Sequence, residues 1–489
     1  MRRLHKLAAA TGVAAAVICA TVQPAQAYTP AVKPQATTIA VGPTTTIFIG
    51  GDGKVYQTGL DVQDPAGNVS RTTPTPLPGL PSGVRAQSIA AAYRFVLVVG
   101  SDGKAYGAGV NAQGQLTDTS ADHSQGWKST LTPLAGLPSG VSAKAVAAGY
   151  AFSLVLGSDG KVYGTGRNIY GELTTSMPSE LNYKLAPLAG LPSGVRATTI
   201  AADGYTTVVL GSDGHVYGAG DSAHGSLTGT GDAKKLTVFG GLPGSLAVKT
   251  VAVSGANVVL LGSDGHVWVT GSNEWGQLGV GATDTKDHPL ARKIPGIDQA
   301  VAIDAGYGNV LAVDKYGITY ATGDNTGGAL GELGNPVTVA DAVRVAPGQP
   351  SKAPFVEVAT GDSDTLVRDA DGVVLGVGYN GQGQLTGTGD RSALTAFAGQ
   401  RISAYKSPAV SGTAKVGSTL TAKNGSWSVK PTAYAYQWYR GSTAVSGATS
   451  ATYKLTSADK GRKIKVRVKG TRTSFTSGTA YSPATGTVG

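Results

Sequence analysis

The stretch Gly157–Leu173, GSDGKVYGTGRNIYGEL, decides the fold of this chain. It follows the apolar run Ser153–Leu156, and Asp159-Gly160 stands between that run and Lys161–Gly164. An Asp-Gly pair between two β-prone runs predicts a hairpin, because glycine tolerates a positive φ and aspartate hydrogen-bonds its own backbone. The second half, GRNIYGEL, predicts a glycine-punctuated loop.

This unit recurs along the chain at intervals of 50 to 57 residues, and a large side chain follows three residues after most of the turn glycines. The turn glycines are Gly53, Gly103, Gly160, Gly214, Gly265, Gly317 and Gly372, and the side chains three residues later are Tyr56, Tyr106, Tyr163, Tyr217, Trp268, Tyr320 and Leu375. Seven copies at this period predict a propeller or solenoid, and about four short strands per copy predict propeller blades. We therefore expect an all-β fold, a seven-bladed β-propeller over residues 37–402, with Thr37–Val41 beside the last blade.

The loop motif carries a family resemblance. Gly-x-Asn-x-x-Gly-x-Leu occurs at Gly109–Leu116, Gly166–Leu173, Gly271–Leu278 and Gly378–Leu385. With the sevenfold period, it resembles the regulator-of-chromosome-condensation repeat, whose members form seven-bladed propellers. The first copy departs from the motif at Gly59–Gln63. The resemblance implies the propeller fold, and no family-specific function follows from it. The family includes nuclear nucleotide exchange factors and, more distantly, secreted bacterial propellers that inhibit β-lactamases.

Residues 403–489 form a different segment, in which alternating runs are separated by Gly/Ser turns. Such runs predict a small β-sandwich. Tyr436–Tyr439, YQWY, is similar to the tryptophan strand of bacterial immunoglobulin-like domains, here without their cysteine pair. The cations Lys463, Lys465, Arg467 and Lys469 alternate with apolar residues, so they should share one face. That face is either a solubilising surface or a site for an anionic cell-wall polymer.

The first 27 residues predict a secretory signal peptide. A basic start (Arg2, Arg3, Lys6) precedes the apolar run Leu7–Ala20, and Ala25–Ala27 fits a cleavage site. Residues 28–36 would be a short lead into the propeller. We expect a secreted bacterial protein, released or associated with the cell wall, with no transmembrane segment.

Charge is unevenly distributed. The net charge is +10, of which residues 403–489 carry +12 and the first 27 residues +3, which leaves −5 for residues 28–402. Cys19, the only cysteine, lies in the predicted signal peptide, so no disulfide or thiolate site is expected in the mature chain. Most aspartates stand in turns, and the histidines lack metal-ligand spacing. We expect no catalytic residues, cofactor, metal or nucleic acid.

Hairpin geometry predicts the binding face. The loop before each hairpin and the glycine loop after it lie at the same edge of the blade, so they share one face of the disc, here called the loop face. The candidate residues on it are Tyr93, Tyr150, Tyr205, Tyr307, Trp127, Tyr170, His224 and Trp275. Aromatic side chains with polar tips on a rigid scaffold are typical of protein recognition. Packing between neighbouring loops is the alternative explanation.

The leading hypothesis is a secreted, non-enzymatic protein that recognises an extracellular protein through the loop face, for example as an inhibitor of an enzyme such as a β-lactamase. This comparison rests on fold-level analogy. Two alternatives stay open. One is a lectin-like protein that binds cell-wall polymers or glycans, and the other is a propeller lyase or hydrolase, which the scarcity of acid and base groups disfavours.

Overall fold

The computed structural model describes residues 39–489, except 51, 121–122, 124, 175–179, 223, 228–232, 245, 282, 332–337, 346–352, 398–401, 403, 428 and 474. The predicted signal peptide and lead, residues 1–36, therefore lie outside the described residues. The described chain is almost entirely β-strand and turn, with two short 3-10 helices, η1 (Thr326–Gly328) and η2 (Ser457–Asp459).

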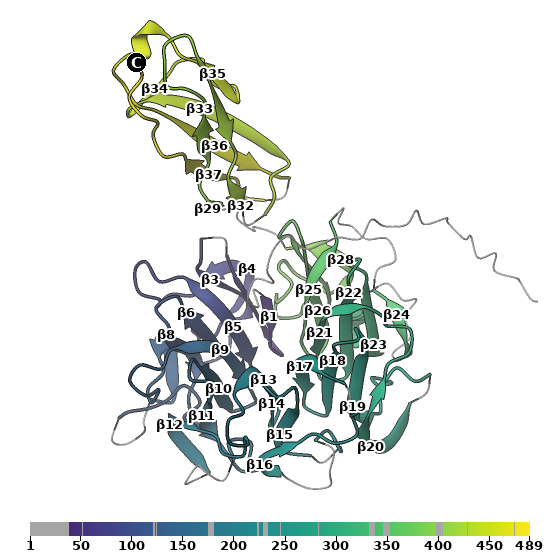
Figure 1. The fold of residues 1–489 in the computed structure, drawn as a ribbon. Helices are drawn as coiled ribbons and strands as arrows, with labels where there is room; N and C mark the ends of the chain where they lie inside the picture. The colour runs from purple at the N-terminus through teal and green to yellow at the C-terminus, as the bar shows by residue number, and fades with distance from the viewer. Residues whose placement is uncertain are drawn as a thin grey trace, which may run out of the picture.

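Seven four-stranded antiparallel sheets follow one another along the chain and are arranged as a ring (Figure 1). In each sheet the strands pair in chain order, as in propeller blades. The first four blades are β1(Ile39–Val41), β2(Thr45–Ile49), β3(Val55–Leu60), β4(Ser70–Pro76); β5(Ala86–Ala92), β6(Phe95–Gly100), β7(Ala105–Val110), β8(Trp127–Pro133); β9(Ala143–Ala148), β10(Phe152–Gly157), β11(Val162–Arg167), β12(Leu181–Pro187); and β13(Ala197–Asp203), β14(Thr206–Gly211), β15(Val216–Gly220), β16(Ala233–Val238). The last three are β17(Val248–Ser254), β18(Asn257–Gly262), β19(Val267–Asn273), β20(Asp284–Lys293); β21(Ala300–Ala305), β22(Asn309–Asp314), β23(Thr319–Asp324), β24(Thr338–Arg344); and β25(Phe355–Thr360), β26(Asp364–Asp369), β27(Val374–Gly378), β28(Arg391–Ala396). The predicted all-β, seven-bladed propeller is confirmed.

The hairpins that contain Asp-Gly form as this motif predicts, and a tyrosine three residues after the glycine, where present, has a second role. In the third blade, Gly160 has a φ of +76° and Asp159 Oδ1 accepts from the Lys161 N–H. The Tyr163 hydroxyl donates to Asp159 Oδ2 over 2.7 Å, while its buried ring packs among side chains of the second blade. Equivalent Tyr–Asp bonds occur at Tyr56–Asp52, Tyr106–Asp102 and Tyr217–Asp213, and in the sixth blade Tyr320 donates over 3.4 Å to Asp314, which stands earlier in the turn. These tyrosines thus join blades and also fasten their own turns.

The ring closes without exchanging strands between its ends. The first blade is built from β1 to β4 alone, and β1 lies beside β25 of the seventh blade, as expected. The Ile39 N–H donates to Glu357 Oε1 over 3.3 Å, and the Thr58 hydroxyl donates to the Gln384 carbonyl over 2.7 Å. Thr165, Thr270 and Thr322 make the same kind of bond to the loop of the preceding blade. The closing seam therefore repeats the contact that joins the other blades.

The segment after the ring forms a second set of sheets, which we call the tail. A three-stranded sheet has the order β30-β31-β35, a four-stranded sheet the order β34-β33-β36-β37, and β29 pairs with β32. Their bounds are β29(Ala404–Lys406), β30(Ala409–Ser411), β31(Thr419–Lys423), β32(Ser426–Trp427), β33(Ala433–Arg440), β34(Thr443–Ala444), β35(Thr452–Lys454), β36(Ile464–Thr471) and β37(Gly478–Tyr481). Trp438 is fully buried in the tail core, where its Nε1 donates to the Ser450 carbonyl. The kinship of the tail with immunoglobulin-like domains stays a prediction.

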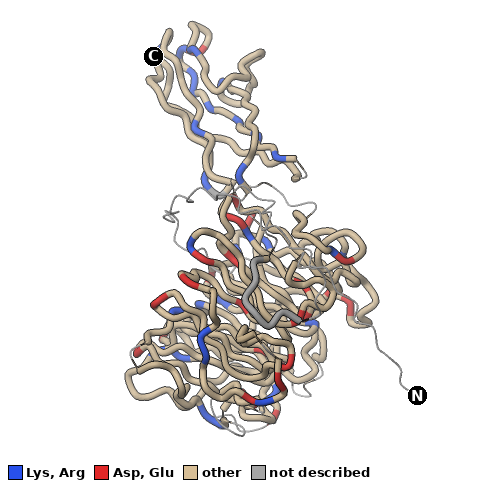
Figure 2. The backbone as a smooth tube through the Cα atoms, turned by 90° about the vertical axis from the view of Figure 1, so that its right-hand side faces the viewer, with Lys and Arg blue, Asp and Glu red and all other residues tan. Residues whose placement is uncertain are grey.

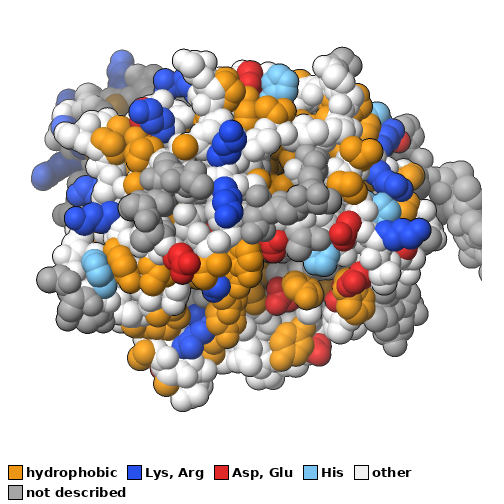
Figure 3. All heavy atoms as spheres, turned by 90° about the horizontal axis from the view of Figure 1, so that it is seen from below, with side chains coloured by type: hydrophobic (Ala, Val, Ile, Leu, Met, Phe, Trp, Pro, Cys, Tyr) orange, Lys and Arg blue, Asp and Glu red, His pale blue; other side chains and the backbone are white. Residues whose placement is uncertain are grey.

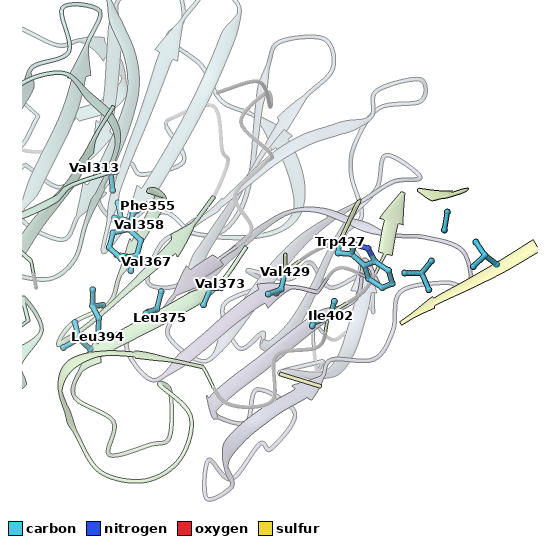
Figure 4. Close-up of a cluster of buried hydrophobic side chains, with 14 of the residues drawn as sticks. Val313, Phe355, Val358, Val367, Val373, Leu375, Leu394, Ile402, Trp427 and Val429 are labelled. Carbon is cyan, nitrogen blue, oxygen red and sulfur yellow. The ribbon is translucent and has the colours of Figure 1, made fainter. Parts of the chain in front are cut away.

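The tail packs directly on the seventh blade. A continuous group of buried side chains runs from Phe355 and Val373 of the blade to Val429, Ile402 and Trp427 (Figure 4). Around it, Asp371 at the blade's turn faces Lys430 Nζ at 3.4 Å and Arg472 Nη1 at 3.7 Å. Ile402, the last residue of the predicted propeller segment, thus belongs to this shared core.

Candidate functional site

The glycine loops that follow the hairpins on the loop face are held by their own asparagines. In the second blade, Asn111 Oδ1 accepts from the Leu116 N–H over 2.7 Å, and its Nδ2 donates to the Thr117 carbonyl. Asn168 and Asn380 make the same pair of bonds in the third and seventh blades. The repeated asparagine is therefore structural, and the residues between the two glycines are free to vary on a rigid support.

Four tyrosines on the loop face form a continuous stack, which we call the aromatic row: Tyr93, Tyr150, Tyr205 and Tyr170. Tyr93 and Tyr150 lie parallel with ring centroids 5.7 Å apart, Tyr150 meets Tyr205 edge-on at 5.6 Å, and Tyr170 lies against Tyr205 at 4.8 Å. Tyr93 and Tyr150 are 45% and 46% exposed. The two explanations offered by the sequence thus combine, because these rings pack on one another and still present a surface.

The other candidates are spread around the same face. Tyr307 is 63% exposed, and Trp275 is half-buried beside Gly308. His224 Nδ1 lies 3.5 Å from Asp287 Oδ1. Trp127 does not join the others: it begins the outer strand β8, where the Arg94 guanidinium lies 5.1 Å from its ring.

A central channel of about 1930 Å³ runs through the ring. Six of the eight candidates line it at the loop face, namely Tyr93, Tyr150, Tyr205, His224, Trp275 and Tyr307, whereas Tyr170 and Trp127 do not. Trp427 and Val429 of the tail border the channel at the end where the hairpin turns lie. The tail thus narrows the channel at its turn end, and the aromatic row lies at the opposite, loop end.

Sequence reasoning missed a group of carboxylates at the loop end of this channel. Asp203, Asp304 and Asp362 line the channel, together with Asp221 and Glu274, and we call these five residues the acidic mouth. Asp304 accepts a hydrogen bond from the Thr360 N–H of the next blade over 2.8 Å. A signal was available. The positions equivalent to Asp304 in the innermost strands are all alanine: Ala40, Ala90, Ala147, Ala201, Ala252 and Ala359.

The surroundings of these carboxylates disfavour their charge. Burial in the channel wall raises the pKa of Asp304 to about 7, although hydrogen bonds from the backbone N–H groups of Thr360 and Ala305 act in the opposite direction. Burial likewise raises the pKa of Asp203 to about 6, and the nearby Asp362 adds to this effect. The pKa of Asp362 is also raised by burial. Each carboxylate lacks a cation strong enough to offset its desolvation.

The described residues offer neither a metal centre nor a membrane span. No three His, Cys, Asp or Glu side chains lie close enough among them to hold a metal ion. Within the same residues, no helix has the length and apolar character needed to cross a bilayer.

The predicted basic face of the tail has the expected alternation. Along β36, Ile464, Val466 and Val468 are buried, while Lys465, Arg467 and Lys469 point outward, and Lys463 is exposed just before the strand. Figure 2 shows basic residues along much of the tail, whereas both signs of charge occur over the propeller. The acidic residue of the tail, Asp459, is fully buried and accepts from Arg440 Nε and the Tyr453 hydroxyl.

Two tyrosines flank the basic strand. Lys465 Nζ lies 5.8 Å from the ring centre of Tyr439 and 5.2 Å from that of Tyr481, and the Arg467 guanidinium lies 6.0 Å from Tyr439. These contacts hold the long side chains against the sheet. The role of this face as a binding site stays a prediction.

The fold defines the class of protein, a seven-bladed β-propeller, and parts of the chain are similar to regulator-of-chromosome-condensation repeats. The model of the Regulator of chromosome condensation (RCC1) repeat matches residues 143–172 and, in a second form, residues 264–313. The solved structure of human WBSCR16 superimposes with a TM-score of 0.60 at 19% identity, over 68% of this chain and 87% of that one. This likeness shows the fold.

Two curated relatives match parts of the propeller. The Ultraviolet-B receptor UVR8 of Arabidopsis thaliana is 28% identical over 263 residues, which are 53% of this chain and 57% of the receptor. The human Protein RCC2 is 36% identical over 159 residues, 30% of this chain and 28% of that protein. The chain thus spans a little over half of one relative and about a quarter of the other, and the similarity concerns the repeats.

Proposed function

We propose that this chain is a secreted, non-enzymatic binding protein that captures a protein partner through its loop face. The observation that carries this proposal is the aromatic row, in which stacked tyrosines remain nearly half exposed on rigid loops. Tyrosine is enriched at the energetic centres of protein interfaces, because it buries a large ring and keeps a polar tip. A partner that covers Tyr93, Tyr150 and Tyr307 would desolvate all three rings at once.

Secretion rests on the predicted signal peptide, and the lack of catalysis rests on the roles of the carboxylates. Asp159 and its equivalents fasten turns, while Asp304 joins neighbouring blades. An extracellular protein that binds an enzyme without transforming it acts as an inhibitor or a recruiter. We propose inhibition of an extracellular enzyme, of which a β-lactamase is one example.

Capture with the full mature chain tests the proposal. Tyr150→Ala should lose a partner that the wild-type protein retains from the culture supernatant, and the partner is then identified by mass spectrometry. Tyr316, 37% exposed beside the hairpin turn of the sixth blade, supplies the matched control Tyr316→Ala. Equal capture by both variants, or retention of polysaccharide alone, would contradict protein recognition through this face. The second result would favour the lectin-like alternative.

We also propose that the tail contacts an anionic cell-wall polymer through Lys463, Lys465, Arg467 and Lys469. The supporting observation is the outward row of cations on β36, which no exposed carboxylate of the described tail neutralises. The fraction of the protein that sediments with purified cell walls should fall for Lys465→Glu/Arg467→Glu, since the attraction is electrostatic. Lowering the salt concentration should restore little of this fraction, because the two cations are gone. The control is Lys415→Glu, in the connection between β30 and β31 of the three-stranded sheet. Unchanged sedimentation of the double variant would remove the anchoring idea.

A further inference from the structure

The charged groups that line the channel are unevenly distributed along its axis. The five carboxylates of the acidic mouth lie at the loop end. Among the described lining residues, the basic side chain at this end is that of His224. The lysines and arginines of the lining, Arg85, Lys144, Lys315 and Arg368, all stand at or near the hairpin-turn end, where Asp52, Asp314, Glu357 and Asp371 accompany them. The loop end therefore carries a concentrated negative potential at physiological or higher pH, focused by the low-dielectric walls of the channel.

This negative mouth opens beside the aromatic row. Asp203 ends β13 and Tyr205 stands in the turn that follows, and the Tyr150 N–H donates to the Gly204 carbonyl between them over 2.7 Å. The tyrosine faces accept cations, because the Arg167 guanidinium already lies 5.2 Å from the ring centre of Tyr205. Arg167 and Arg94, the latter engaged with Trp127, are not among the residues lining the channel. The surface thus combines exposed aromatic rings with the channel carboxylates of Asp203, Asp304 and Asp362.

We infer that the partner of the loop face presents a loop tipped by lysine or arginine, whose cationic side chain enters the acidic mouth while the loop packs on the aromatic row. This inference rests on the proposed function and specifies the chemistry of the partner. Charge complementarity selects it. An acidic loop would be repelled by Asp203, Asp304 and Asp362, and a neutral loop would leave them unpaired.

The geometry favours a flexible organic cation over a metal ion. The described carboxylates are too dispersed for three of them to surround one ion. The four-carbon stem of lysine or the fork of arginine spans such spacings and pairs with more than one carboxylate. The pairing also recovers the desolvation penalty that raises the carboxylate pKa values, because a nearby cation favours their ionised forms.

Three synthetic cyclic peptides test this inference directly. They differ in two tip residues, Lys-Arg, Asp-Glu or Ala-Ala, and are titrated against the full mature chain at about pH 8, where an aspartate of pKa about 7 is mostly ionised. The Lys-Arg peptide should bind at least about tenfold more tightly than the others, and its affinity should fall as salt rises. Equal binding of the three peptides, or no binding of the Lys-Arg peptide, overturns the inference.

Variants separate this inference from the proposed function. Asp203→Asn/Asp304→Asn keeps side-chain size and should reduce binding of the Lys-Arg peptide by about tenfold. Asp298→Asn is the control, because Asp298 is 62% exposed and lies outside the channel lining. If Tyr150→Ala abolishes capture of the protein partner but the double variant binds the Lys-Arg peptide normally, the proposed function stands and the cationic tip is wrong. If Tyr150→Ala captures the partner normally, the proposed function itself is wrong.

Discussion

The rings of Tyr93 and Tyr150 stack across the boundary between the second and third blades, with 5.7 Å between their centroids and 18° between their planes. Neither ring is buried, so the stack is a surface feature built by two separate repeats. Figure 3 shows the molecule from below, and on this face hydrophobic side chains lie among charged ones. Stacked rings that remain exposed allow recognition to be separated from stability by mutation.

Removing one ring should therefore affect folding little. Tyr93→Ala and Tyr150→Ala should each lower the free energy of unfolding by no more than about 1 kcal/mol, since an exposed aromatic pair contributes about 0.5–1.5 kcal/mol. Thermal and urea unfolding of the full chain measure this. A loss of several kcal/mol would identify the tyrosines as packing residues and deprive the capture experiment of its meaning.

The Tyr163 hydroxyl at the hairpin should contribute more to stability than its exposure suggests. Tyr163→Phe retains the buried ring but removes the 2.7 Å bond to Asp159, so we expect a loss of about 1 kcal/mol in the free energy of unfolding. Tyr316→Phe, which changes a partly exposed hydroxyl, should be nearly neutral. Equal stability of Tyr163→Phe and wild type would show that the turn aspartate needs no tyrosine.

The seam between the first and seventh blades should open when Thr58 is replaced. Thr58→Val deletes the bond to the Gln384 carbonyl and leaves a buried acceptor unpaired, at a cost of about 1–3 kcal/mol. Thr270→Val removes the same kind of bond between the fourth and fifth blades. Hydrogen exchange should increase in β1 and β25 for Thr58→Val alone. Identical exchange maps for both variants would show that the closing seam is no weaker than an internal one.

The buried aspartates predict a stability that falls as pH rises. The folded pKa of Asp304 is about 7, above its unfolded value near 3.9, so the native state binds more protons between about pH 4 and pH 7. The free energy of unfolding should consequently decrease across that window, and Asp304→Asn should make the decrease shallower. Urea unfolding at about pH 5 and about pH 8 measures the slope. An unchanged slope, with Asp298→Asn as control, would contradict the raised pKa.

The docking of the tail should depend on its hydrophobic contacts. Asp371→Ala removes ion pairs to Lys430 and Arg472 that are long and partly exposed, so it should change stability by less than about 1 kcal/mol. Val429→Asp places a charge in the core shared with Phe355 and Val373 and should release the tail. Small-angle scattering distinguishes the two states. Release by Asp371→Ala would reverse this assignment.

Much of the architecture follows from the local chemistry of the repeats. Asp159-Gly160 sets a turn through neighbours in the chain, and the repeated period places Tyr163 and its equivalents at one register whatever the rest of the chain does. The shared face of Tyr93, Tyr150 and Tyr307 likewise follows from antiparallel pairing. These features depend on short-range interactions, so the sequence determines them by itself.

The acidic mouth, the narrowed turn end and the tail contact were decided only in the tertiary structure. Asp203 and Asp304 stand in different blades, and the curvature of the ring brings them to the same mouth of one channel. Their raised pKa values come first from burial in the channel wall and, for Asp203, also from the charge of Asp362, which is distant in sequence. Desolvation and Coulomb energy depend on distance in space, whereas periodicity records distance along the chain. The aspartate that breaks the alanine register was visible in the sequence, but the surroundings that raise its pKa came only with the closed ring.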